Sequence, residues 1–166
     1  MSASDEHEFL LQRVQPAMVG LIDGSLSTLA PIFSVAIVSH KPFYAFVAGL
    51  ATSVGAGISM AFSEGLSDTG ELTGRGNPVV RGSITGVGTF IGGILHSLPF
   101  LISNYHVALF SAIAVVGCEL LALAYLRWRF FQDTFIRALG IVTFAGMIIV
   151  GISVALGSWL GTPGGG

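Results

Sequence analysis

Five long apolar segments constrain the fold of this chain more than any other feature. A helix that crosses the hydrocarbon core of a bilayer needs about 20 mostly apolar residues. Five stretches meet that requirement, and they cover residues 16–39, 43–66, 83–103, 106–127 and 134–160. The segments between them hold the polar, glycine and proline residues typical of turns. The sequence therefore predicts an all-α membrane protein with five transmembrane helices.

The composition agrees with a membrane location. Of the 166 residues, 52% are hydrophobic and 10% are charged, whereas soluble domains carry about 25% charged residues. A net charge of −2 gives no reason to expect a nucleic acid partner. The single cysteine, Cys118, excludes an internal disulfide and a cysteine zinc cluster.

The chain divides into three parts. Residues 1–15 are polar and acidic, unlike a cleavable signal peptide, and are expected to form a short acidic cytoplasmic segment. Residues 16–160 are expected to form the five-helix transmembrane domain, and residues 161–166 a flexible tail.

The distribution of basic residues predicts the orientation. In a five-span arrangement, six arginines fall on one side of the membrane and Lys41 alone on the other; the arginines are Arg13, Arg75, Arg81, Arg127, Arg129 and Arg137. Cytoplasmic loops carry the excess of lysine and arginine. We therefore expect the N-terminus to be cytoplasmic. The preference for arginine over lysine is typical of GC-rich bacterial genomes, which favours a bacterial inner membrane.

Three of the nine acidic residues fall within the predicted spans, namely Asp23, Glu64 and Glu119. Charged side chains in a membrane are costly and usually face a cavity or a partner. The sequence places no lysine or arginine deep in a span to neutralise them. Such acids are either protonated or bind a cation from solution.

Asp23 has two interpretations. As the N-cap of a helix that starts at Gly24, it would leave residues 24–39 spanning only about 24 Å, short of a hydrocarbon core of about 30 Å. A helix that starts near Pro16 has the needed length and carries Asp23 into the membrane. Local unwinding at Asp23-Gly24 would reconcile the two.

Met60 and Glu64 lie one helical turn apart on one face of the second span. Asp23 and Met60 each lie about 10 Å from the cytoplasmic ends of their antiparallel helices. The three side chains are therefore expected to line a short path that runs perpendicular to the membrane plane. Carboxylates bind hard divalent ions, and a thioether favours softer transition metals such as Fe²⁺. The plainer alternatives are an interfacial acid at Glu64 and a gap-filling methionine.

Other polar groups carry weaker signals. Glu119 either carries a proton or hydrogen-bonds to a neighbouring helix, and His96 is expected to be a satisfied core histidine. Glu8 belongs to an acidic tail that is either solvated or gathers cations at the cytoplasmic mouth. Small residues recur at fourfold spacing at Ala51, Gly55, Ser59 and Ser63, at Gly82 and Gly86, and at Gly88 and Gly92. Such rows serve packing within one subunit or contact between subunits.

Two motifs resemble the vacuolar iron transporter family. They are "GLIDGSLSTLAPIFS" in the first span and "GAGISMAFSEGLSD" in the second. The stretches "QPAMVGLIDGSLSTLAPIF", "GLATSVGAGISMAFSE" and "LTGRGNPVVRG" look most like the membrane domain of bacterial membrane-bound ferritins, which export iron. The similarity covers nearly the whole chain after about residue 12.

The resemblance implies a homodimer of five-helix subunits, with a path for ions along the interface lined by the first and second helices. It implies export of Fe²⁺, with Mn²⁺ as a second ion, in exchange for protons. Asp23, Met60 and Glu64 match the pathway residues of the family. The metal is the transported substrate, and no bound cofactor or enzymatic activity is expected.

Two departures concern metal delivery. Only residues 67–82 stand where many family members carry an acid-rich metal-binding domain, and Asp68 and Glu71 are the acids in this loop. The chain also has no ferritin-like domain with Glu-x-x-His ligands. A ferritin-like donor protein is therefore one expected partner. The rival functions are an exporter of small organic cations and a membrane scaffold that transports nothing.

Overall fold

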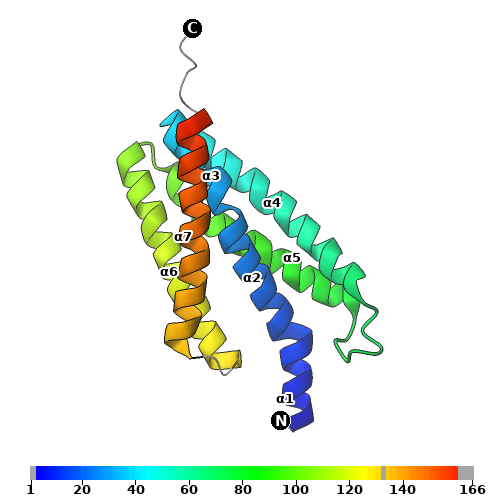
Figure 1. Ribbon diagram of the computed structural model, residues 1–166. Helices are drawn as coiled ribbons and strands as arrows, with labels where there is room; N and C mark the ends of the chain where they lie inside the picture. Colours follow the sequence, from blue (N-terminus) through cyan, green and yellow to red (C-terminus); the bar gives the residue numbers. More distant parts are fainter. Residues whose placement is uncertain (1–2, 132–133, 161–166) are drawn as a thin grey trace.

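The described part of the protein is a bundle of helices (Figure 1). At its centre, the helix of residues 78–95 packs closely against the helices of residues 15–27 and 42–67. The computed structural model describes residues 3–131 and 134–160, and no strand occurs among them. The predicted tail, 161–166, lies outside the described residues. The elements in chain order are α1 (Ala3–Phe9), the π-helical turn η1 (Leu10–Val14), α2 (Gln15–Ser27), α3 (Leu29–Ser39), α4 (Pro42–Ser67), α5 (Pro78–Leu95), the 3₁₀ turn η2 (Leu98–Leu101), α6 (Tyr105–Phe131) and α7 (Phe135–Leu160).

Five helices of the described chain are long and apolar enough to cross a membrane, as predicted. The first is the continuous run Ser4–Ser39, formed by α1, η1, α2 and α3. The others are α4, α5, α6 and α7. Figure 1 shows the start of α1 and the end of α7 at opposite ends of the bundle, as an odd number of crossings requires. The chain thus has the helices of a multi-pass membrane protein.

The first helix begins much earlier than predicted. Its 36 residues extend about 54 Å at 1.5 Å per residue, well beyond a hydrocarbon core of about 30 Å. The expectation that the helix starts near Pro16 is wrong, because the acidic N-terminal segment is itself helical. A π-helical turn just before Pro16 accommodates the proline, which has no N–H to donate.

The interruption in this helix lies at Thr28, not at Asp23-Gly24 as suggested above. Asp23 is an interior residue of α2, so its interpretation as an N-cap is wrong. Pro31 explains the position of the break. A proline in a helix lacks the N–H that would bond to the carbonyl four residues earlier, here that of Ser27.

The third span also starts earlier than predicted. It runs from Pro78 to Leu95 rather than over residues 83–103. The Asn77 side chain caps it by accepting hydrogen bonds from the backbone N–H groups of Val79 at 2.9 Å and Val80 at 3.3 Å. A consequence is that Arg81, placed in a loop by sequence reasoning, lies in the first turn of α5.

Glycines allow α5 to pack closely between α2 and α4. A Cβ atom on Gly24 would lie 2.0 Å from the carbonyl oxygen of Thr89 in α5, and one on Gly86 would lie 2.6 Å from the carbonyl oxygen of Gly57 in α4. Both rows of small residues on α5 therefore serve packing within the subunit.

The row Ala51, Gly55, Ser59 and Ser63 behaves differently. All four residues are exposed, and a Cβ atom on Gly55 would meet nothing within 4 Å. This row does not pack against another described helix of the subunit.

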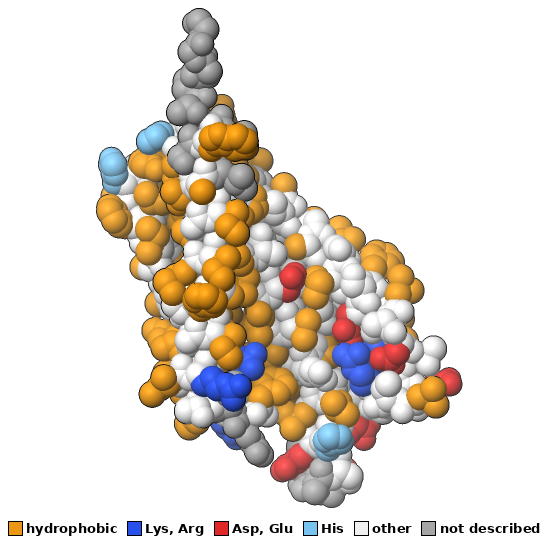
Figure 2. All heavy atoms as spheres, in the orientation of Figure 1, with side chains coloured by type: hydrophobic (Ala, Val, Ile, Leu, Met, Phe, Trp, Pro, Cys, Tyr) orange, Lys and Arg blue, Asp and Glu red, His pale blue; other side chains and the backbone are white. Residues whose placement is uncertain are grey.

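Arginine side chains gather at the end of the bundle where α1 begins (Figure 2). Lys41 lies in the connection between α3 and α4, at the opposite end of both helices from Arg13, Arg75 and Arg81. The asymmetry on which the predicted orientation depends is therefore present in the fold.

Candidate metal site and the ionic groups around it

Asp23 and Met60 line the same groove on the membrane-facing surface. The groove is bounded by α2, α4 and α7 and has a volume of about 480 Å³; its lining residues are Val19, Ile22, Asp23, Leu26, Ser27, Met60 and Ile149. Residues 37 positions apart in the sequence thus line one groove, as the depth argument predicted. The groove joins a carboxylate and a thioether within an otherwise mostly apolar wall.

Asp23 is the only ionisable residue of this groove lining. Its side chain is half-buried, and no basic side chain of the described residues forms an ion pair with it. On the face of a membrane helix, an ionised carboxylate without a partner is costly. A cation, a proton or a second protein surface is therefore needed at this point of the groove.

Glu64 is not part of this groove lining. Its Oε1 atom accepts hydrogen bonds from Nη2 of Arg75 at 2.7 Å and from Nε of Arg81 at 2.9 Å. Sequence reasoning found no lysine or arginine deep enough in a span to neutralise the acids, but for Glu64, near the end of α4, two arginines do so. Arg81 is fully buried and serves as a resident counter-ion.

Arg81 also holds the start of the α4–α5 loop. Its guanidinium donates to the backbone oxygens of Glu64, Asp68 and Gly76 and to the Asp68 carboxylate. A fully buried guanidinium needs several acceptors. The α4–α5 loop and the end of α4 supply these acceptors. The ionic cluster is therefore part of the structure at the end of the bundle that the sequence predicts to be cytoplasmic.

Asp68 follows α4 directly and remains ionised in this cluster. Burial by itself raises the pKa of its carboxyl. Hydrogen bonds from Thr73 and from the backbone N–H of Gly70 outweigh that effect, together with the charge of Arg81 and a hydrogen bond from Arg75. The net result is a pKa below the ordinary value for aspartate.

The other candidate entrance acids lie at the same end of the bundle. Glu8 on α1 accepts a hydrogen bond of 2.8 Å from Nε2 of Gln12. The same Gln12 nitrogen donates to the carbonyl oxygen of Gly74, in the loop that carries Glu71. Glu71 is exposed. The N-terminal helix and the loop are thus joined through Gln12, and among the described acids Glu8, Asp68 and Glu71 surround this junction.

Glu119 forms part of a separate buried network. Its Oε2 atom lies 3.0 Å from Nδ1 of His96, and Nε2 of His96 lies 2.9 Å from the hydroxyl oxygen of Thr28. The prediction of a satisfied core histidine is confirmed, and Glu119 does hydrogen-bond to a neighbouring helix. No local sequence pattern indicates that Thr28 joins them.

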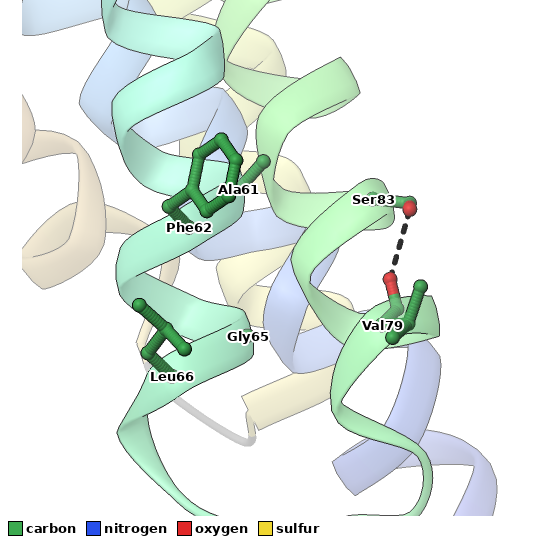
Figure 3. A pocket seen from close by; sticks show the side chains of 6 residues that line it. All are labelled: Ala61, Phe62, Gly65, Leu66, Val79 and Ser83. Carbon is green, nitrogen blue, oxygen red and sulfur yellow. Dashed lines mark hydrogen bonds between the residues drawn. The ribbon is translucent and has the colours of Figure 1, made fainter.

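A second groove, between α4 and α5, carries no ionisable side chain in its lining (Figure 3). Phe62 and Leu66 of α4 and Val79 of α5 line it, and the Ser83 hydroxyl donates to the Val79 carbonyl oxygen at 2.8 Å. Phe62 therefore lies on a different face of α4 from Met60. This groove offers apolar surface and no ligands for a cation.

No group of three or more histidine, cysteine, aspartate or glutamate side chains is placed to hold a metal ion within the described ranges. A metal in the Asp23–Met60 groove would have these two side chains as its protein ligands in one subunit. Comparisons of the chain with protein-family models, with curated proteins and with solved structures give no match.

Proposed function

We propose that this protein exports divalent transition-metal ions, Fe²⁺ with Mn²⁺ as a second substrate, from the cytoplasm in exchange for protons. The observation that carries the proposal is the shared groove of Asp23 and Met60 on the membrane-facing surface. A carboxylate there needs a positive partner. A thioether beside it selects for transition metals over Mg²⁺ and Ca²⁺.

The cytoplasmic mouth in this proposal is the end that holds Glu8, Asp68 and Glu71. Glu64 stands between this mouth and the groove, one turn from Met60 on α4. Both guanidinium hydrogen bonds to its carboxylate go to Oε1. An arriving cation would meet Oε2, and it would compete with Arg75 and Arg81 for the negative charge.

A homodimer would complete the site. The exposed row Ala51, Gly55, Ser59 and Ser63 runs beside Met60 on α4. Rows of small residues let membrane helices approach closely. A second copy packed along this row would cover the open groove and add a second Asp23 and Met60 to the path. Metal would be delivered from the cytoplasm by a ferritin-like donor or directly from solution.

The rival functions find less support in the geometry. An exporter of organic cations would be expected to place aromatic side chains beside its carboxylate, and the groove lining contains none. A non-transporting scaffold has no use for an acid on a membrane-facing surface.

Flux measurements test the proposal. Purified protein in liposomes should carry Fe²⁺ into the lumen, where an enclosed chelating dye detects it. Protons should leave the lumen in exchange, so that the pH of the lumen rises. Asp23→Asn preserves size and removes the charge, so it should abolish the metal flux. Val19→Ala, in the same groove lining, is the matched control and should retain it. Metal flux at the wild-type rate through Asp23→Asn would refute the mechanism.

A further inference from the structure

The buried Thr28–His96–Glu119 network joins three elements of the bundle. Thr28 lies at the break between α2 and α3, His96 at the C-terminal end of α5, and Glu119 in the middle of α6. The His96 side chain is fully buried, and that of Glu119 is 9% exposed. None of the three belongs to the metal groove lining.

The hydrogen bonds fix where the protons of this network lie. The Thr28 hydroxyl donates to the carbonyl oxygen of Gly24 at 2.8 Å. A hydroxyl has a single proton to donate, so toward Nε2 of His96 it acts as the acceptor. Nε2 therefore carries a proton.

A second proton is required between His96 and Glu119. Their Nδ1 and Oε2 atoms lie 3.0 Å apart, the distance of a hydrogen bond. A carboxylate facing the lone pair of a neutral Nδ1 has no proton to share. The pair is therefore either imidazolium with carboxylate or imidazole with carboxylic acid, and both forms hold the same single proton.

The surroundings favour the neutral form. The other carboxyl oxygen, Oε1 of Glu119, is buried and has no hydrogen-bond partner among the described residues. Leaving a charged carboxylate oxygen unpartnered costs more than leaving a carbonyl oxygen unpartnered. The proton then resides on Oε2 and is donated to Nδ1.

This proton lies close to the proposed metal groove. Gly24, whose carbonyl oxygen begins the chain of hydrogen bonds, directly follows Asp23 in α2. Thr28 is five residues beyond Asp23, about 7.5 Å along the helix axis. Gly24 is also packed against the backbone of Thr89 in α5, the helix that ends at His96. Contacts that leave little free space thus lie between Asp23 and the network.

We infer that the His96–Glu119 pair is the proton-binding site of the proposed exchange, with Thr28 as the residue that positions the imidazole. The inference rests on the proposed function. A divalent ion beside ionised Asp23 leaves one uncompensated positive charge in a low-dielectric region. Loss of the shared proton leaves the pair with one negative charge and restores neutrality. Return of a proton to the pair favours release of the metal.

Other ionisable groups lie on the elements around the pair. They are Asp23 on α2, Glu64 at the far end of α4, Arg81 at the far end of α5 and Arg127 two turns further along α6. Cys118, next to Glu119, is exposed. Among the acids of the proposed metal path, Asp23 is the closest along the chain to the network, five residues before Thr28.

The first test examines the proton arrangement without any metal. Nitrogen NMR of the full chain, with labelled histidine rings and with the three exposed histidines changed by His7→Asn, His40→Asn and His106→Asn, reports on His96 alone. We expect Nε2 to be protonated and Nδ1 to share a proton with the carboxyl. Thr28→Val should disturb the Nε2 signal. An unprotonated Nε2 with a protonated Nδ1 would overturn the inference.

The second test measures exchange. Glu119→Gln keeps the shape and a hydrogen bond to Nδ1 but cannot release a proton, and Cys118→Ala is the neighbouring control. In liposomes with an enclosed pH dye and Mn²⁺ as probe, Glu119→Gln should lower the protons moved per metal ion by about one, since the pair shares a single proton. The control should match the wild type.

The outcomes separate the two proposals. If Glu119→Gln carries Mn²⁺ with the full proton counter-flow, the proton site is wrong and metal export stands. If the wild type carries no metal at all, the proposed function fails, and the inference that depends on it fails as well.

Discussion

The Nε atom of Arg81 lies 2.9 Å from Oε1 of Glu64, and this contact ties the start of α5 to the end of α4. The arginine side chain is 1% exposed and the glutamate side chain 12% exposed. An acid that sequence reasoning left without a counter-ion thus has one built into the adjacent helix. Charge pairs thus join the ends of these two helices at this end of the bundle.

Removal of this counter-ion should destabilise the protein. Arg81→Gln leaves Glu64, whose side chain is 12% exposed, without its fully buried partner, and breaking such a buried pair costs about 3–5 kcal/mol. Thermal unfolding in detergent should show a markedly lower midpoint. The matched variant Arg75→Gln removes a guanidinium that is 22% exposed, for which about 0–1 kcal/mol is expected. Equal destabilisation by both variants would contradict the assignment of Arg81 as the central charge.

Close packing between α2 and α5 should make Gly24 intolerant of any side chain. A Cβ atom there would lie 2.0 Å from a backbone oxygen of Thr89, so Gly24→Ala should force the helices apart and lower the unfolding midpoint strongly. Gly55→Ala adds the same methyl group where nothing lies within 4 Å. In the monomer it should be neutral or slightly stabilising, because alanine favours the helix by about 1 kcal/mol over glycine. A similar loss in both variants would argue against this helix packing.

The state of Asp68 should appear in the pH dependence of stability. Its pKa is lowered in the folded protein, so its ionised form stabilises the fold at pH values above the unfolded pKa of about 3.9. That contribution is lost as the pH falls through the lowered folded pKa. The difference in unfolding midpoint between wild type and Asp68→Asn should be constant near neutral pH and should shrink below about pH 4. A difference that grows on acidification would have the wrong sign.

Met60 should affect which metal is bound. Met60→Leu keeps the volume and removes the sulfur. The affinity for Fe²⁺ should fall by about tenfold, which corresponds to ~1.4 kcal/mol, while the affinity for Mn²⁺ should change much less. Competition binding with the two ions measures this ratio. Unchanged discrimination would show that the thioether is not a ligand.

Much of the helical architecture could be predicted because membrane spans leave a strong signal in single sequences. The length of an apolar run and the position of arginines gave five spans without any knowledge of packing. The meeting of Asp23 and Met60 in one groove followed from depth arithmetic alone. Metal binding there is a prediction that the geometry supports and that experiments must test.

The ends of the elements were harder to predict, and the errors were consequential. Placing the start of the third span at residue 83 put Arg81 in a loop and hid its pairing with Glu64. The "GNP" sequence before it held the missing signal, because Asn77 followed by Pro78 is a typical helix start. Pro31 likewise indicated the break at Thr28, since a proline removes the hydrogen bond to the carbonyl group one helical turn earlier. The Thr28–His96–Glu119 network depends on how three helices are packed, which local sequence patterns do not encode.

Anomalous X-ray scattering from crystals soaked with Fe²⁺ or Mn²⁺ tests the central claim most directly. The account predicts a peak at the metal's absorption edge between the Asp23 carboxylate and the Met60 sulfur, and its absence in Asp23→Asn crystals soaked in the same way. Metal bound only around Asp68 and Glu71, with none in the groove, would contradict it.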